Sequence, residues 1–191
     1  MQRRMIRGIK TPSAADVAAR LAITEVLHRY CRGMDRMDRE LTLSCWHPGG
    51  TDEHAPLYAG SAEGFIDWLW PVHAAMQGTR HVLSNIVIEV TGDRAVSESY
   101  WNVTLRVPRG EEVVDIFGGG RYLDQLEYIN GVWAFRHRCS VHDWDRVEPV
   151  GGTMSNIAGP ALIVPNNPEA TIRPSARDRS DYSYTLLDRS D

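Results

Sequence analysis

Apolar and polar positions follow two different periods along this chain, and the period changes near residue 79. Before that point, apolar side chains recur every three or four residues, the spacing of one helix face. After it, apolar and polar residues alternate, which is typical of strands with one buried face. The pattern therefore predicts helices first and a meander of antiparallel strands afterwards, an α+β fold with its helices on one face of the sheet.

The first helix has a clear apolar stripe and recognisable ends. Ser13 and Asp16 form a weak capping box before it, and we expect it to run to about Arg32 and to end at Gly33. The stripe consists of Ala19, Ile23, Val26, Leu27, Tyr30 and Met34. Tyr30 therefore faces whatever this helix covers.

Two further helices and a loop are expected before the sheet. Asp38 can cap a short helix that ends near residue 45. The segment His47–Gly60 contains prolines and glycines, so it predicts a loop with at most one short strand. Ser61 caps a third helix, over residues 62–76, which Pro71 should kink or end early.

The second half of the chain predicts four long strands in a curved sheet. Their expected ranges are 81–90, 94–107, 111–129 and 132–144. Asn130-Gly131 is a strong signal for a two-residue hairpin turn. Gly118-Gly119-Gly120 lies inside the third strand and allows a bulge or a sharp bend, which a cone-like sheet requires.

The chain divides into three parts on these patterns. Residues 1–12 form a flexible lead, residues 13–145 form one domain, and residues 146–191 form a C-terminal arm without a clear period. The arm contains Pro149, Pro160, Pro165, Pro168 and Pro174. It is either an ordered arm that packs on the domain or on a partner, or a tail that is partly disordered.

Composition narrows the class of protein. The chain has 191 residues, 42% hydrophobic and 24% charged, with a net charge of −4. A mixed, mildly acidic surface gives no support to nucleic-acid binding, and no apolar run reaches membrane-spanning length. The three cysteines form no C-x-x-C pair, and no apolar stretch follows the basic N-terminus. We therefore expect a cytoplasmic protein without a metal site or cofactor.

Two positions carry candidate chemistry. Asp35 follows the end of the first helix, and His81 opens the first long strand, where alternation places His81, Leu83 and Asn85 on one face. A carboxylate that holds one imidazole nitrogen fixes the tautomer and raises the basicity of the other. Tyr30 could donate to a developing oxyanion. Purely structural roles stay open: a satisfied strand histidine, a helix-end aspartate and a core tyrosine.

The remaining histidines favour structural roles. His47 and His54 lie in the expected loop beside Asp52 and Glu53, and such close neighbours do not converge on a metal from rigid elements, so a solvated loop is favoured. His28 and His73 lie on helices and should face solvent or a subunit contact. The tryptophans, Trp101 among them, should fill the core or line a cavity.

The segments Tyr30-Cys31-Arg32-Gly33-Met34-Asp35, Arg80-His81 and Asn130 to Arg138 carry a family resemblance. They resemble SnoaL-like lyases of the nuclear-transport-factor-2-like superfamily, which include scytalone dehydratase, bile-acid dehydratase and hexachlorocyclohexane dehydrochlorinase. The resemblance implies a cystatin-like cone, in which three N-terminal helices and a curved sheet enclose a pocket. It also implies an Asp35–His81 dyad, a catalytic Tyr30 and an active-site Arg138.

The function expected from this resemblance is that of a cofactor-independent lyase acting on a mostly apolar cyclic small molecule. Asn85, Trp101 and Arg138 would contact the substrate, although Arg138 could instead pair with a carboxylate on a neighbouring strand. Two alternatives stay open: a non-catalytic subunit like the β subunit of ring-hydroxylating dioxygenases, and a binder of hydrophobic ligands. A homodimer or homotrimer is expected.

Overall fold

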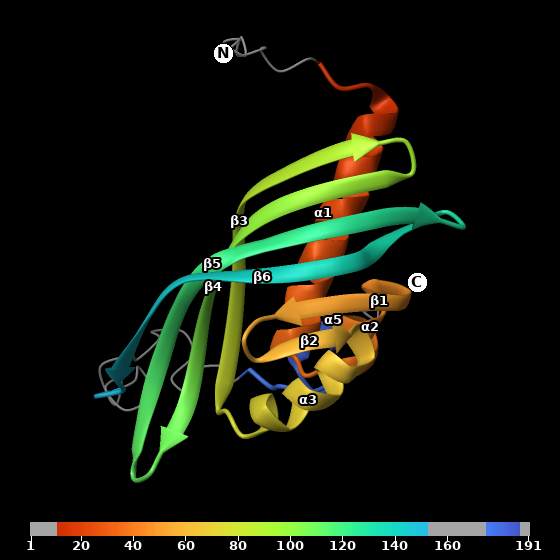
Figure 1. The fold of residues 1–191 in the computed structure, drawn as a ribbon. Coiled ribbons are helices and arrows are strands. Elements are labelled where there is room, and N and C mark those ends of the chain that lie inside the picture. Colours follow the sequence, from red (N-terminus) through yellow and green to blue (C-terminus); the bar gives the residue numbers. More distant parts are fainter. Residues whose placement is uncertain (1–10, 153–174, 188–191) are drawn as a thin grey trace, which may run out of the picture.

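The computed structural model describes residues 11–152 and 175–187, which form an α+β fold of helices gathered against a curved sheet (Figure 1). The helices are α1 (Ala14–Asp35), α2 (Arg39–Leu43), α3 (Ala62–Ala74) and α5 (Tyr182–Leu187). The strands are β1 (Trp46–His54), β2 (Tyr58–Ser61), β3 (Gly78–Thr91), β4 (Arg94–Arg109), β5 (Glu112–Ile129) and β6 (Val132–Pro149). The predicted order of helices followed by long strands is confirmed.

The six strands form one sheet in the order β2-β1-β6-β5-β4-β3. Neighbours are antiparallel except β1 and β6, which run parallel. The segment expected as mostly loop, 47–60, instead supplies β1 and most of β2. Its prolines and glycines are tolerated because the ladder between β1 and β6 shifts register between Trp46 and Thr51, where Pro48, Gly49 and Gly50 lie.

Helix α1 begins as predicted and ends later than predicted. The Ser13 hydroxyl accepts from the Asp16 N–H at 3.1 Å, and the Asp16 side chain accepts from the Ser13 N–H, so the capping box is complete. Gly33 does not end the helix. A Cβ there would lie 2.3 Å from Thr42 Oγ1, so this glycine lets α1 and α2 pack closely. Helix α1 extends to Asp35, and the left-handed backbone conformation that follows a helix end is found at Met37 (φ 51°).

The other predicted caps are present. Asp38 accepts from the Leu41 N–H at 3.0 Å at the start of α2, and Ser61 accepts from the Gly64 N–H at 3.1 Å at the start of α3. Pro71 does not end α3, because the helix continues to Ala74. Three residues beyond the proline remain helical, and they include His73, whose side chain is buried.

The glycines of β5 mark the bend of the sheet. The register between β5 and β6 shifts between Gly119 and Gly120. A Cβ on Gly119 would meet the Trp144 ring at 2.7 Å, and a Cβ on Gly120 would meet the Trp101 ring at 2.5 Å. The expected bulge is confirmed, and these glycines also allow two indole rings to lie against the backbone of the strand. The predicted hairpin turn is also confirmed, with positive φ at both Asn130 and Gly131.

The core lies between α1, α3 and the sheet. Its most completely buried apolar residues are Ile23, Leu27, Tyr30, Phe65, Ile66, Leu126 and Phe135. Strand β6 extends four residues beyond the expected domain boundary at 145, and the end of the arm forms α5. Pro160, Pro165, Pro168 and Pro174 lie outside the described residues. Within residues 11–152 and 175–187, no helix has the length and apolar character needed to cross a membrane.

Candidate active site

Asp35 and His81 meet where the last turn of α1 packs on the start of β3. Asp35 Oδ1 lies 2.7 Å from His81 Nδ1, and Asp35 Oδ2 accepts from the His81 backbone N–H at 2.9 Å. The His81 side chain is 7% exposed and that of Asp35 is 15% exposed. Because one carboxylate holds both the ring and the backbone of the histidine, the orientation of the imidazole is fixed. An acceptor at Nδ1 places the proton there and leaves Nε2 free as a base.

His81 forms part of the wall of an apolar cavity of about 630 Å³. Aromatic and aliphatic side chains from α1, α3 and the long strands make up most of this wall, among them Met34, Phe65, Trp68, Leu69, Trp101 and Ile116. Tyr30 and Trp101, two of the residues singled out in the sequence, also line the cavity. A volume of this size is within the roughly 300–1,000 Å³ that is usual for small-molecule sites.

Tyr30 is buried within a group of polar and aromatic side chains. Its ring packs edge-on against Tyr122, and a side-chain hydrogen bond joins the two phenols. The Arg138 guanidinium lies over the Tyr30 ring at 4.2 Å. Burial raises the pKa of Tyr30 well above its ordinary value, so the phenol stays neutral and can donate.

Arg138 is not a substrate-contacting residue in this structure. Its side chain has no exposed surface and is not part of the cavity wall. It forms a two-point ion pair with Asp124 on β5, with Nε–Oδ1 and Nη2–Oδ2 distances of 2.7 and 2.9 Å. The alternative considered from the sequence, a carboxylate on the neighbouring strand, is the arrangement observed. Aromatic rings of Tyr30, Tyr122 and Phe135 surround the guanidinium.

Asn85 does not lie on the face that the sequence predicted for it. The strand pairing of β3 with β4 is irregular between Ser84 and Val87, and Asn85 has a left-handed backbone with φ 48°. The irregularity breaks the alternation that was expected to align Asn85 with His81 and Leu83. Asn85 is exposed and lies outside the cavity wall.

His73 is a cavity residue that the sequence analysis placed at the surface. Its side chain is buried, and its ring centroid lies 6.3 Å from that of His81. Burial, followed by electrostatic interactions with nearby His81 and Arg177, lowers the pKa of His73 to about 3. The ring is therefore neutral at physiological pH. The helical spacing of Phe65, Leu69 and His73, which repeats every four residues, is the pattern that could have placed this residue on the inner face.

His54 is a second cavity residue that the sequence analysis missed. It was interpreted as part of a solvated loop, but it ends the β-strand β1, and its ring lines the cavity. Its Nδ1 lies 2.5 Å from Oδ1 of Asp52, whose side chain has no exposed surface. Asp52 and His54 are two residues apart, so strand alternation places them on one face. Once β1 is known to be a strand, the Asp-x-His spacing indicates this pair.

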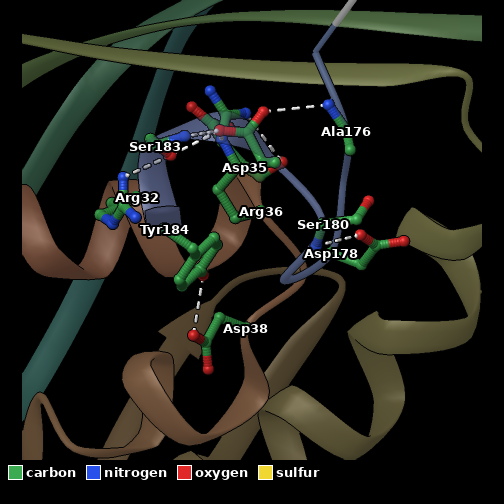
Figure 2. A network of polar contacts seen from close by, with 10 residues as sticks. Arg32, Asp35, Arg36, Asp38, Ala176, Asp178, Ser180, Ser183 and Tyr184 are labelled. Atoms are coloured by element: carbon green, nitrogen blue, oxygen red, sulfur yellow. Dashed lines mark hydrogen bonds and ion pairs between the residues drawn. The ribbon is translucent and has the colours of Figure 1, made fainter. Parts of the chain in front are cut away.

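The C-terminal segment packs on the end of α1 near Asp35 (Figure 2). Arg32 Nη1 donates to Ser183 Oγ at 3.2 Å, and the Tyr184 hydroxyl donates to Asp38 Oδ2 at 2.8 Å. The first contact joins α5 to α1, which carries Asp35, and the second joins it to the N-cap of α2. This part of the arm is therefore ordered on its own domain.

Arg177 connects this segment to the far end of α3. Its Nη1 donates to the backbone carbonyls of His73 and Met76 at 2.8 and 2.7 Å. Burial lowers the pKa of Arg177, and the negative charge of nearby Asp35 opposes that effect. No motif or spacing in the sequence associates residue 177 with the site. Among the described residues, no group of three or more His, Cys, Asp or Glu side chains is arranged to hold a metal ion.

The chain belongs to the SnoaL-like domain family, which matches residues 15–139. This match runs from α1 into the first half of β6, and so includes both members of the candidate dyad. The expected membership of the SnoaL-like and nuclear-transport-factor-2-like superfamily is therefore confirmed. No curated protein matches the sequence.

Solved structures show the same fold at low identity. A candidate scytalone dehydratase from Novosphingobium aromaticivorans is 20% identical, with a TM-score of 0.62 over 72% of this chain and 97% of its own. A hexachlorocyclohexane dehydrochlorinase from Novosphingobium barchaimii is 18% identical, with a TM-score of 0.62 over 72% and 94%. A Mycobacterium tuberculosis protein of unknown function is 21% identical, with a TM-score of 0.60 over 94% of both chains. A cystatin-like protein from Nostoc punctiforme is also similar, so the cystatin-like fold class is confirmed.

Proposed function

We propose that this protein is a cofactor-independent lyase, a dehydratase or a related dehydrohalogenase or isomerase, that acts on a mostly apolar cyclic small molecule. One observation carries the proposal: His81, aligned by Asp35, lies in the wall of an apolar cavity. A base that is fixed in orientation and faces a water-poor space is suited to abstracting a proton from carbon.

The reaction needs only proton transfers by groups of this chain. Nε2 of His81 accepts a proton from a substrate carbon, and the electron pair of that C–H bond forms the new double bond. The bond to the leaving group breaks at the same time or afterwards. In a dehydration the proton passes from His81 to the departing hydroxyl, which leaves as water. Asp35 stabilises the imidazolium that forms in between.

Tyr30 supports the same chemistry from the cavity wall. The neutral Tyr30 phenol, which is hydrogen-bonded to Tyr122, would turn its O–H to an oxygen that gains negative charge, such as a carbonyl next to the deprotonated carbon. Arg138, held by Asp124 over the Tyr30 ring, acts as a positioning residue in this proposal and does not touch the substrate.

The substrate class follows from the composition of the cavity wall. Most of its lining residues are aromatic or aliphatic, so binding comes chiefly from burial of apolar surface. The polar groups are few and are mostly histidine and tyrosine side chains. This composition favours a ring system with a small number of oxygen or halogen substituents.

The test is turnover by His81 and Asp35 variants on a substrate found by screening cyclic hydroxyketones and haloalicyclic compounds. We expect His81→Gln and Asp35→Asn to lower kcat by about 10²–10⁴-fold while the variants stay folded. His137→Gln is the matched control, because His137 bonds to Thr51 and is outside the cavity wall. Full activity in both dyad variants would refute the proposal.

The same experiments distinguish the two alternative functions. Tight ligand binding without turnover would favour a carrier, and co-purification with an iron–sulfur subunit would favour a non-catalytic subunit. The expected homodimer or homotrimer stays a prediction, which light scattering of the 21.5 kDa chain will test.

A further inference from the structure

A second acid–imidazole pair lies in the same cavity as the first. His54 Nδ1 and Asp52 Oδ1 are 2.5 Å apart, and both residues come from β1, whereas the Asp35–His81 pair joins α1 to β3. The Asp52 side chain has no exposed surface, and its second oxygen, Oδ2, has no hydrogen-bond partner among the described residues. Since burying a charge costs free energy unless it is paired, the His54 ring is an important partner of this carboxylate.

The His54 ring is held rigidly with one nitrogen free. It stacks on Phe65 with a centroid distance of 4.4 Å and an interplanar angle of 14°, and it lies 6.1 Å from the Tyr122 ring. Asp52 occupies Nδ1. The free ring nitrogen is therefore Nε2, on a ring that lines the cavity and is partly exposed to it. In the neutral imidazole with Nδ1 protonated, Nε2 is a hydrogen-bond acceptor.

The two pairs lie near different ends of α3. Phe65, which stacks on His54, precedes His73, the neighbour of His81, by eight residues on this helix. At about 1.5 Å per residue, these helix positions are about 12 Å apart along the axis. Trp68, Leu69 and Val72 lie between them in the sequence and line the cavity. His54 and His81 thus contact different positions along α3, and His54 suits recognition of a substituent other than the reacting carbon.

We infer that His54, oriented by Asp52, is a substrate-binding residue that accepts a hydrogen bond from a hydroxyl group about one ring system away from the reacting carbon. The inference rests on the proposed function and narrows its substrate class to elongated molecules, with an apolar ring between a reacting end and a hydroxyl-bearing end. A site built around an acceptor discriminates against the analogue without the hydroxyl, because the buried acceptor is then left unpaired.

The test compares the binding of two probes that differ in one hydroxyl. The first is cyclohexanone with a para-hydroxyphenyl group on the carbon opposite the carbonyl, and the second is the same ketone with a plain phenyl group. Calorimetry with the full-length protein gives the dissociation constant of each. We expect the phenol to bind about tenfold or more tightly than the phenyl compound.

Variants assign this preference to His54. His54→Phe keeps the stacking on Phe65 and should abolish the preference while the phenyl probe binds as before. Asp52→Asn keeps the ring but removes the carboxylate that fixes the tautomer, and should reduce the preference; it also serves if His54→Phe fails to fold. Glu53→Gln is the matched control, because Glu53 lies between Asp52 and His54 in the sequence but on the opposite face of the strand. This variant should leave the preference unchanged.

The outcomes separate this inference from the proposed function. A preference that persists in His81→Gln and disappears in His54→Phe supports the inference whether or not turnover is found. An equal preference in wild type, His54→Phe and Asp52→Asn would overturn it, as would the failure of both probes to bind. Turnover that depends on His81 would leave the proposed function standing in either case.

Discussion

The guanidinium of Arg138 and the carboxylate of Asp124 form a two-point ion pair between β6 and β5, with neither side chain exposed. Ser97 Oγ also donates to Asp124, at 3.2 Å. The pair lies beneath the aromatic rings that separate it from the cavity. Its consequence is structural: it fixes the Tyr30 and Tyr122 rings rather than touching a ligand.

Removing one partner of this pair should be costly. We expect Arg138→Met to lower the free energy of unfolding by about 3–5 kcal/mol, because Asp124 is left charged and buried. Urea unfolding measures the loss. Arg106→Met is the control: its pair with Asp115 is much more exposed, so it should cost about 0–1 kcal/mol. Similar values for the two variants would contradict the buried-pair interpretation.

His73 should make stability fall with acidity. Its pKa is lowered to about 3 in the folded chain, against 6.5 as the ordinary value, so the unfolded chain binds more protons between these limits. Stability is therefore lost as pH falls below about 6.5, by about 2 kcal/mol at pH 5. Unfolding free energies of wild type and His73→Leu from pH 7 to 4.5 test this. The variant should show a shallower slope, and an unchanged slope would contradict the assignment.

Gly120 should not tolerate a side chain. A Cβ there would lie 2.1 Å from the Val141 carbonyl oxygen and 2.5 Å from the Trp101 ring, so Gly120→Ala should cost about 1–3 kcal/mol of stability. Gly78→Ala is the matched strand control, because its nearest new neighbour is Arg106 Cβ at 4.0 Å, and a change within about 0.5 kcal/mol is expected. Thermal unfolding compares the two variants. Equal melting temperatures would show that the sheet relaxes around Gly120.

Arg177 should tie the C-terminal segment to the domain. Arg177→Met removes two hydrogen bonds to backbone carbonyls at the end of α3, and should cost about 1–2 kcal/mol. It should also speed limited proteolysis near α5. Arg179→Met provides a control in the same segment, because Arg179 is 70% exposed in its ion pairs and should change stability by less than about 0.5 kcal/mol. If Arg177→Met matches this control, the segment is held by other contacts.

Local patterns were sufficient for most of the fold. The caps at Ser13, Asp38 and Ser61, the Asn130-Gly131 turn and the long strands follow from side-chain chemistry within a few residues. The predictions failed where a residue distant in the sequence determines the local structure. Gly33 faces Thr42 instead of ending a helix, and residues 46–54 become a strand because β6 is present to pair with them.

The candidate site shows the same division. The sequence pointed to Asp35 and His81, and the structure places them in hydrogen-bond contact. Asn85 lies outside the cavity wall because the strand pairing of β3 is irregular there. Arg138 pairs instead with Asp124, a buried carboxylate on the neighbouring strand. His54 was missed because its burial depends on β1 pairing with β6, which no local pattern reports. His73 shares a four-residue spacing with Phe65 and Leu69, but only the packing of α3 on the sheet shows that this face is buried.

The sequence by itself determined the order and type of the main elements, because helix and strand periods and caps are properties of short segments. Only the tertiary structure decided which polar side chains share the cavity and which are enclosed in the core. That depends on strand register and helix packing, which bring together residues as far apart as Asp35 and His81. A shift of one residue in a strand would turn each of its side chains to the other face.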